Sequence, residues 1–369
     1  MPKNKKQTTK KPPRTPVAVP PPPPLPEEVA PEEIYQFLDM YMDPSRLLPL
    51  QEAHLRVGFL NIDSLYGPTK LPYVFWLIER ANLDIVVLVD VRSTDASVPF
   101  LLSHARRTLG PGAIAKSTYG PPGHEETVRR RRRLTHNARV GGQIMLCNPH
   151  WGRFCSTTWA DPSGLGLVLG AEFIPSPDSR TLVIGVYIPV PPRQSHNPDS
   201  SCLWKLWIQW ARQQGVRGTP LEWVKTYIAT KITNFRNRHP NGTVICGGDY
   251  NATVGPAPGG VHGRLDRWME ECHLASAIHE QGLKGVHTRW SGTTPTGHID
   301  HVLYDKDCVA SSLINAQVLE ETIWTDLSDH RWVLAGFKYS QGIPPRPLPR
   351  PPPAPLVDVD TTDKARVRC

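Results

Sequence analysis

The chain has 369 residues, a net charge of +8, 7 cysteines and 39% hydrophobic residues, which is enough for one large or two ordinary domains. No segment approaches the ~20 apolar residues of a membrane span, and the lysine-rich start lacks the apolar region of a signal peptide. The cysteines are odd in number and form no CxxC pair, which argues against a disulfide framework or a zinc cage. We therefore expect a soluble intracellular protein that makes no contact with membranes.

The positive charge is concentrated at the two ends of the chain. Residues 1–26 carry six basic and no acidic side chains, and residues 341–369 carry five basic and three acidic ones, so residues 27–340 are close to neutral. Both ends are rich in proline, and we expect residues 1–32 and 341–369 to be tails that are disordered or polyproline II. The N-terminal lysines favour a nuclear location, although they could equally contact phosphate or simply be solvated. The C-terminal prolines could bind an SH3-like domain, but a linker is favoured.

Between the tails we expect one domain, at about residues 45–340. The periodicity predicts, in chain order, a short amphipathic helix, a strand, a helix, a buried strand, a helix and three strands, over residues 31–42, 55–61, 73–81, 83–90, 97–109, 140–147, 165–173 and 181–188. Strand, helix and strand at this spacing indicate an α/β arrangement. An insertion at about residues 120–137 contains five consecutive arginines, which favour a mobile solvated loop over one that contacts phosphate.

The second half of the predicted domain begins with a tryptophan-rich helical region. Its helical tryptophans are more typical of core packing than of a surface that stacks on bases. A second helix begins at Thr219-Pro-Leu-Glu222, which has the pattern of a capping box with proline at the first helical position. The remaining segments predict a strand, a helix and two more strands, over residues 243–249, 264–273, 297–304 and 332–337.

The strand predicted at residues 243–249 ends in a group of residues that could serve chemistry. Gly247 and Gly248 allow the backbone to approach another group closely where the strand ends. Asp249 and Asn251 are two positions apart, so their side chains point to the same side of an extended chain. Taken alone, this segment is explained equally well by a strand that ends in an ordinary Asp/Asn turn.

Several other predicted strands end in the same way. The polar residues at or beside their ends are Asn61, Asp63, Asp90, Tyr187, Asp300 and the segment Ser328-Asp329-His330. Oxygen ligands of this kind select Mg²⁺, Mn²⁺ or Ca²⁺ over zinc. A carboxylate-rich pocket with amide and imidazole donors suits a phosphate ester held on Mg²⁺, with Mn²⁺ as a substitute.

The order of these motifs resembles that of a known superfamily. In chain order they are Phe59-Leu-Asn-Ile-Asp63, Asp84-Ile-Val-Val-Leu-Val-Asp90, Val186-Tyr-Ile-Pro189, Gly248-Asp-Tyr-Asn251, His298-Ile-Asp-His-Val-Leu303 and Ser328-Asp-His330. This series resembles the endonuclease/exonuclease/phosphatase superfamily over essentially the whole predicted domain. Together with Arg289-Trp-Ser-Gly292, it is most similar to the apurinic-type endonuclease domain of non-LTR (LINE-type) retrotransposons. The resemblance implies a four-layer α/β sandwich, in which two facing mixed sheets are flanked by helices and the site lies at one end.

The resemblance also implies a metal centre. Asp90 takes the position of the superfamily's metal-binding glutamate, with Asp329 near the metal and Asp63 as an additional ligand. Asn61 is expected near the metal and in contact with the substrate phosphate. Two departures stand out. The superfamily's Gln-Glu-Thr is Val-Asp-Val here, so the metal carboxylate is one methylene shorter, and Val190 stands where many DNA-cleaving members have asparagine.

The remaining roles implied by the resemblance concern water and phosphate. Asp249 is expected to orient or deprotonate the attacking water, and Asn251 to bind the scissile phosphate. His330 is expected to donate a hydrogen bond to a phosphate oxygen and to be oriented by Asp300, which would fix its tautomer. Tyr187 is expected to hydrogen-bond the phosphate or the leaving oxygen.

These inferences favour a Mg²⁺-dependent endonuclease that nicks DNA and leaves a 3′-hydroxyl and a 5′-phosphate. A second interpretation keeps the fold and changes the substrate, to RNA, an inositol phosphate or a sphingolipid. A third interpretation is a catalytically degenerate domain that binds nucleic acid or another partner. It is suggested by Asp90 in place of glutamate together with the basic tails.

Overall fold

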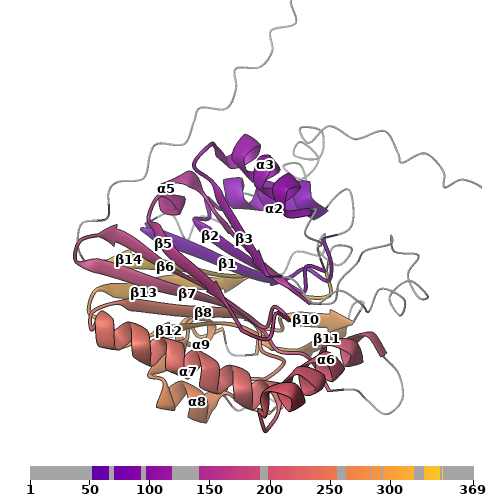
Figure 1. Ribbon diagram of the computed structural model, residues 1–369. Coiled ribbons are helices and arrows are strands. Elements are labelled where there is room, and N and C mark those ends of the chain that lie inside the picture. Colours follow the sequence, from indigo (N-terminus) through magenta and orange to yellow (C-terminus); the bar gives the residue numbers. More distant parts are fainter. Residues whose placement is uncertain are drawn as a thin grey trace, which may run out of the picture.

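The computed structural model describes residues 52–65, 70–92, 97–118, 141–191, 198–255, 263–283, 285–291, 294–319, 328–340 and 343. The N-terminal tail, nearly all of the C-terminal tail, the helix predicted at residues 31–42 and the arginine-rich insertion lie outside these residues. Within them, two six-stranded sheets face each other, and helices cover the outer face of each (Figure 1). None of the helices described is long and apolar enough to span a membrane.

The first sheet has the strand order β13-β14-β1-β2-β4-β3. Its strands are β13 (Ser311–Val318), β14 (Val333–Tyr339), β1 (Leu55–Asn61), β2 (Ile85–Val89), β4 (Gln143–Cys147) and β3 (Ile114–Thr118). Only the central pair β1 and β2 is parallel. Helices α2 (Lys70–Arg80) and α3 (Ser97–Leu109) cover its outer face, and the short α5 (Pro149–Gly152) follows β4 (Figure 1). The inner strands are apolar throughout because both of their faces are buried.

The second sheet has the strand order β5-β6-β7-β8-β12-β9. Its strands are β5 (Cys155–Ala160), β6 (Val168–Ser176), β7 (Ser179–Tyr187), β8 (Thr243–Asp249), β12 (Asp300–Asp305) and β9 (Leu274–Ser276). Only β7 and β8 are parallel, and they are joined through α6 (Pro198–Gln214) and α7 (Pro220–Arg238). The short helices α8 (Asp266–Glu271) and α9 (Ala277–Glu280) follow β8, and β10 (Arg289–Ser291) pairs with β11 (Thr294–Gly297) as a separate hairpin.

Helix α7 begins where its capping pattern predicts. The Thr219 hydroxyl accepts a hydrogen bond from the Glu222 backbone, and the Glu222 carboxylate accepts one from the Thr219 backbone. Both halves of the capping box are therefore present, which satisfies two of the free donors of the first turn. The buried stripe of the helix packs against β7 and β8 and fixes the parallel crossover that delivers Asp249.

Two glycines near the end of β8 pack tightly against neighbouring strands. A Cβ atom on Gly247 of β8 would lie 2.5 Å from the ring of Phe59 on β1, so only glycine fits between these strands. Gly248 has a φ of +134°, and a Cβ atom there would lie 2.1 Å from the Val186 carbonyl oxygen. The close approach predicted for these two glycines is thus an approach to the neighbouring strand and to the opposite sheet.

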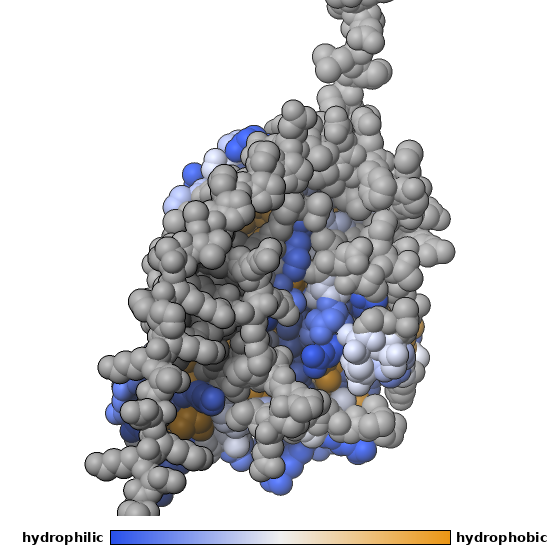
Figure 2. All heavy atoms as spheres, turned by 90° about the vertical axis from the view of Figure 1, so that its right-hand side faces the viewer, coloured by the Kyte–Doolittle hydropathy of each residue, from blue (hydrophilic) through white to orange (hydrophobic). Residues whose placement is uncertain are grey.

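The carboxyl ends of β1, β2, β7 and β8 lie at one end of the sandwich. The Asn61 amide at the end of β1 donates to the Asp249 carboxylate at the end of β8, with a nitrogen–oxygen distance of 2.9 Å. This contact joins the two sheets where their parallel strands finish. The same end carries the β10–β11 hairpin, on the right of Figure 1, and it faces the viewer in Figure 2, where hydrophilic residues gather near its centre.

Candidate active site

Asp249 lies at the centre of the site and is almost completely buried, with 2% of its surface exposed. Its Oδ2 atom accepts hydrogen bonds from the amides of Asn61, at 2.9 Å, and Asn251, at 3.2 Å. Its Oδ1 atom accepts from the Asn251 backbone N–H at 2.9 Å. Three donors from two sheets therefore hold this carboxylate in one orientation, which is the requirement for positioning a reacting group.

The backbone conformation and the side-chain hydrogen bonds of Asn251 fix its position. Its backbone has a φ of +48°, a left-handed conformation that asparagine adopts more readily than most residues. One amide hydrogen goes to Asp249 and the other to the Ile188 carbonyl oxygen, at 2.8 Å. In this arrangement both amide hydrogens are used inside the protein, so Asn251 orients Asp249.

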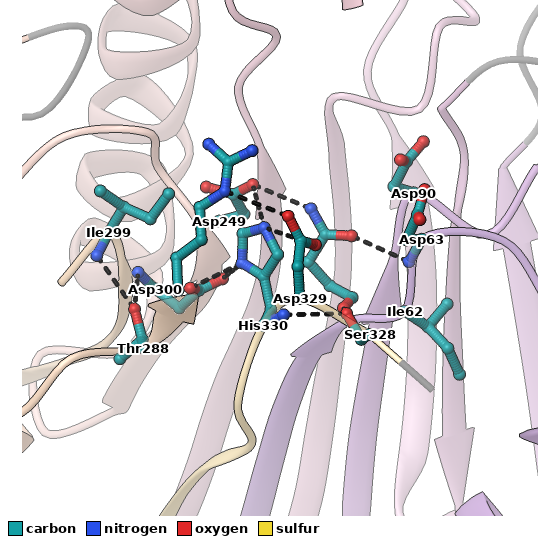
Figure 3. Close-up of polar contacts among 12 residues, drawn as sticks. Ile62, Asp63, Asp90, Asp249, Thr288, Ile299, Asp300, Ser328, Asp329 and His330 are labelled. Atoms are coloured by element: carbon teal, nitrogen blue, oxygen red, sulfur yellow. Dashed lines mark hydrogen bonds and ion pairs between the residues drawn. The ribbon is translucent and has the colours of Figure 1, made fainter. Parts of the chain in front are cut away.

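His330 and Asp300 form a buried carboxylate–imidazole pair. The Nδ1 atom of His330 lies 3.0 and 2.8 Å from the two oxygens of Asp300, which fixes that nitrogen as the donor and leaves Nε2 free to face the site. Nε2 lies 3.9 Å from Asp249 Oδ2 and 3.6 Å from Asp329 Oδ1. The pair thus presents one imidazole nitrogen to the same space as the central carboxylate (Figure 3).

The electrostatics of this pair favour proton chemistry near neutral pH. Burial raises the pKa of Asp249 to about 7, and the nearby Asp300 adds to the rise, while His330 and the Asn61 amide oppose it. For His330, burial alone would lower the pKa, but Asp300 and then Asp249 and Asp329 raise it to about 9. A carboxylate near 7 beside a protonated imidazole is suited to accept a proton while the imidazole donates a hydrogen bond.

Two hydroxyls hold the segments that carry Asp300 and His330. The Thr288 hydroxyl accepts from the backbone N–H groups of Ile299 and Asp300, both at 3.0 Å. The Ser328 hydroxyl donates to the Asn61 carbonyl oxygen and accepts from the His330 N–H (Figure 3). These buried hydroxyls explain why the segment from residue 328 to residue 330 sits against the end of β1.

The other part of the site lies after β1 and β2. The Asp90 carboxylate is paired with Arg92, whose Nη2 and Nε atoms lie 2.7 and 3.2 Å from its two oxygens. The same Nη2 lies 2.8 Å from an oxygen of Asp63. Tyr187 is affected by charges from both parts of the site. Burial, Asp90 and Asp249 all raise the pKa of its hydroxyl well above the ordinary value. That hydroxyl therefore stays protonated and can donate.

The structure brings all nine sequence-predicted residues to this end of the sandwich. Six of them are joined directly by the contacts of Asp249 and His330, namely Asn61, Asp249, Asn251, Asp300, Asp329 and His330. Asp63 donates its N–H to the Asn61 side chain at 3.1 Å, and Tyr187 is the register partner of Asp249 across β7 and β8. The Asp90 side chain is linked to Asp63 by Arg92.

Sequence reasoning missed two arginines at this site. Arg92 stands two positions after Asp90, a spacing that could have suggested an ion pair. Arg289 of β10 lies in a motif that was noted for its resemblance but was given no role, and its Nε atom lies 3.3 Å from Asp329 Oδ2. Burial would lower the pKa of Arg289, but Asp329 and Asp249 raise it, so it keeps its charge beside the site.

The donor sets for a metal ion are of two kinds. Asp249, Asp300 and His330 each offer one ligand atom, all within 4.8 Å of one another, so this cluster could hold a metal ion. The carboxylates predicted as metal ligands are different residues, and each already has a cationic partner. Asp63 and Asp90 are paired with Arg92, and Asp329 with Arg289. In this arrangement arginine side chains occupy the carboxylates of the predicted ligand set.

Comparisons with known proteins point to one fold. No protein family and no curated protein matches the sequence. Among solved structures, an AP endonuclease from Archaeoglobus fulgidus is similar over 77% of this chain and 99% of its own, with 13% identity and a TM-score of 0.53. The human Nocturnin catalytic domain with bound sulfate is similar over 79% and 95%, with 16% identity and a TM-score of 0.49. Truncated TDP2 from Caenorhabditis elegans is similar over 77% and 96%, with 15% identity and a TM-score of 0.46.

At these identities the similarity concerns the fold alone. The fold assignment rests on the AP endonuclease. Two mixed six-stranded sheets with flanking helices confirm the sandwich that the motif order predicts. The narrower resemblance to the LINE-type subclass stays a prediction. The chain has an α/β sandwich fold of two facing mixed sheets flanked by helices, similar to that of the A. fulgidus AP endonuclease.

Proposed function

We propose that this protein is a phosphodiester hydrolase that cuts nucleic acid. The observation that carries the proposal is the buried Asp249, held by two amides, beside the outward-facing nitrogen of a His330–Asp300 pair. This arrangement combines a proton acceptor with a pKa of about 7 and a hydrogen-bond donor for an anionic oxygen. Hydrolysis of a phosphate ester requires both functions at one point.

The proposed reaction uses the chain's own residues in defined roles. Asp249 accepts a proton from a water molecule whose oxygen attacks phosphorus, and Asn61 and Asn251 hold the carboxylate for that step. The Nε2–H of His330 donates to a phosphoryl oxygen, with Asp300 keeping the imidazole oriented and charged. The bond from phosphorus to the 3′-oxygen breaks, and that oxygen takes a proton from solvent while it accepts a hydrogen bond from the Tyr187 hydroxyl. The products are a 3′-hydroxyl and a 5′-phosphate.

DNA is the proposed substrate, and the support for it is the sequence pattern. The paired Gly248-Asp-Tyr-Asn251 and Ser328-Asp-His330 motifs resemble those of retrotransposon endonucleases, and the A. fulgidus AP endonuclease shares the fold. We propose nicking of one DNA strand, with Mg²⁺ or Mn²⁺ supplied from solution. The metal requirement is tested separately, because the carboxylates predicted as its ligands are paired with arginines.

The experiment is a plasmid-nicking assay on the full chain. Supercoiled plasmid is incubated with wild type, Asp249→Ala and Asp178→Ala, each with Mg²⁺ and with EDTA. Asp178 is an exposed carboxylate in the turn between β6 and β7, at the other end of the sheet, and serves as the matched control. We expect wild type and Asp178→Ala to nick at equal rates and Asp249→Ala to be slower by about 10²- to 10⁴-fold.

The ends produced by nicking identify the bond that breaks. A nick with a 3′-hydroxyl is extended by a DNA polymerase without prior treatment, and a 5′-phosphate allows direct ligation. Equal nicking by Asp249→Ala and wild type would disprove the mechanism. Absence of nicking by wild type, together with hydrolysis of RNA or inositol phosphates, would move the same site to another substrate.

A further inference from the structure

Arg92 occupies the space between the two carboxylates that follow β1 and β2. Its Nη2 atom lies 2.7 Å from Asp90 Oδ2 and 2.8 Å from Asp63 Oδ1, and its Nε atom lies 3.2 Å from Asp90 Oδ1. Both oxygens of Asp90 and one oxygen of Asp63 are therefore engaged by a single guanidinium group. Such a two-pronged contact is the strong form of a charge-assisted hydrogen bond.

The backbone around Arg92 is built to hold this geometry. The parallel pairing of β1 and β2 continues past both strands, because Ser64 N–H donates to the Asp90 carbonyl at 2.8 Å and Leu65 N–H donates to the Val91 carbonyl at 3.0 Å. Arg92 N–H donates to the Gly141 carbonyl oxygen at 2.9 Å, next to β4. Two neighbouring loops are thus tied together at the point where the ion pairs form.

The residues that form the pairs also adopt an uncommon backbone conformation. Asp63, Asp90 and Arg92 have φ values of +43°, +54° and +49°, a left-handed conformation that L side chains adopt at a cost of about 1 kcal/mol or more each. Such positions persist where surrounding contacts over-determine them. The three ion-pair residues therefore share a strained arrangement that the two tied loops maintain.

The ion pairs are shielded from water unevenly. The side chain of Asp90 is 7% exposed, that of Arg92 17% and that of Asp63 31%. Burial would lower the pKa of Arg92, but Asp90 and Asp63 raise it well above its ordinary value, so the guanidinium is a permanent cation. Asp90 and Asp63 would repel each other without it.

We propose that Arg92 is the resident cation of this half of the site, and that a divalent metal ion binds Asp63 and Asp90 only by displacing it. A Mg²⁺ ion needs carboxylate oxygens at about 2.1 Å, and it would share those oxygens with guanidinium nitrogens of like charge. Arg92 and the ion therefore compete. The competition concerns metal binding and does not depend on the proposed function. Its consequence for hydrolysis rests on that function.

The test measures metal binding without any nucleic acid. The probe is Mn²⁺. Electron paramagnetic resonance measures the signal of free Mn²⁺, which decreases as the ion binds to protein. The full chain is tested as wild type, Arg92→Gln and Arg238→Gln. Arg238 is the matched control, because its two terminal nitrogens pair with both oxygens of Glu172, at 3.2 and 2.6 Å, at the far end of α7. We expect Arg92→Gln to bind Mn²⁺ roughly tenfold more tightly than wild type, and Arg238→Gln to match wild type.

A second substitution shows where the additional Mn²⁺ binds. Asp90→Asn added to Arg92→Gln should abolish the gain, because the ion loses its main carboxylate. If the gain persists, the ion lies elsewhere, such as at Asp249, Asp300 and His330, and the proposal is wrong. Equal Mn²⁺ affinity in wild type and Arg92→Gln, or no binding by either, also overturns it.

A conservative variant guards against loss of folding. If circular dichroism shows that Arg92→Gln is unfolded, Arg92→Lys keeps the charge but cannot reach both oxygens of Asp90 and Asp63 together. We then expect Mn²⁺ binding a few-fold tighter than wild type, and unchanged affinity would count against competition. Failure here is separable from failure of the proposed function, because the latter is decided by nicking with Asp249→Ala.

Discussion

The two halves of the site handle charge in opposite ways. The half that includes β8, β12 and His330 is buried, and its acidic groups Asp249 and Asp300 are balanced by an imidazole whose protonation can change. The half that follows β1 and β2 is more open, and Asp63 and Asp90 are balanced by an arginine whose protonation cannot change. Figure 3 shows Asp63 and Asp90 on one side of the site and Asp249, Asp300 and His330 on the other.

This difference separates two tasks within one site. Proton transfer requires a group that titrates near neutral pH, and the buried half contains Asp249, whose pKa burial raises to about 7. In the open half the Arg92 guanidinium keeps its charge and pairs with both carboxylates, so this half holds a fixed cation in place of a titrating imidazole. Tyr187 lies between them electrostatically, since the charges of both halves act on its hydroxyl.

The largest expected effect comes from breaking the titrating pair. We expect His330→Gln to slow DNA nicking by about 10²- to 10⁴-fold, because the donor to the phosphoryl oxygen is lost. Asp300→Asn should slow it less, because the imidazole remains but loses its charge partner. The double variant should be no slower than His330→Gln, since Asp300 acts through His330.

Rates are measured under single-turnover conditions, with folding checked by thermal denaturation. Additive losses in the double variant would mean that Asp300 acts on the substrate independently. The same cycle with Arg92→Gln and His330→Gln should be close to additive, because Arg92 pairs with Asp63 and Asp90 whereas His330 pairs with Asp300 and faces Asp249.

The second effect concerns the contact between the halves. Gly247→Ala should lower the free energy of unfolding by about 3 kcal/mol, because the added methyl would lie 2.5 Å from the Phe59 ring. Urea denaturation measures the change. Phe59→Leu together with Gly247→Ala should recover part of it, since a smaller side chain makes room. If the double variant is less stable than the sum of the single changes predicts, overpacking is not the cause.

The sequence predicts the centre of this fold far better than its edges. Strand β1 was predicted over its observed range, and β8 likewise, because each is an apolar run buried on both faces. The strands that the sequence did not predict include all four edge strands, β13, β3, β5 and β9. In β5, polar and apolar residues follow no burial pattern, since an edge strand is covered on only part of its surface.

The sequence likewise predicts one part of the site and not another. Residues at strand ends could be placed together from the sequence, because parallel strands finish at one edge. The pairing of Asp63 with Arg92 could not, because it depends on two left-handed loops that lie beside each other only after β1 and β2 have paired. The roles of the nine site residues stay predictions until variants are measured.

The third effect is a pH dependence of stability that belongs to the buried half. His298 is stacked on His301, with ring centres 4.7 Å apart, and meets His279 edge-on. Burial, and then the nearby His279 and His287, lower the pKa of His298 to about 4, although Asp300 opposes them. The folded protein therefore holds His298 neutral.

The unfolded chain takes up a proton at this histidine as the pH falls through about 6.5, whereas the folded protein does not until about 4. Stability is thus unaffected above pH 6.5 and falls between pH 6.5 and pH 4. At pH 5 the loss should be about 2 kcal/mol. In His298→Asn, which cannot titrate, the difference in unfolding free energy between pH 7 and pH 5 should shrink by that amount. An unchanged difference would assign the pH dependence to other groups.

The smallest effect tests how the open half is held. The Lys70 ammonium group, at the start of α2, donates to the carbonyl oxygens of Ile62, Asp63 and Ser64, at 2.7, 2.9 and 2.9 Å. Lys70→Met should lower the free energy of unfolding by about 1 kcal/mol, because three carbonyls lose a charged donor and regain only water. Lys338→Met, on the exposed side of β14, is the control.

Hydrogen exchange distinguishes local from global loosening in Lys70→Met. The amides of Ser64 and Leu65, which tie this loop to the end of β2, should exchange faster, while the Asn251 amide in the buried half should keep its wild-type rate. Faster exchange at all three would mean that the halves open together. Faster exchange at Ser64 and Leu65 alone would show that the open half moves without disturbing the buried half.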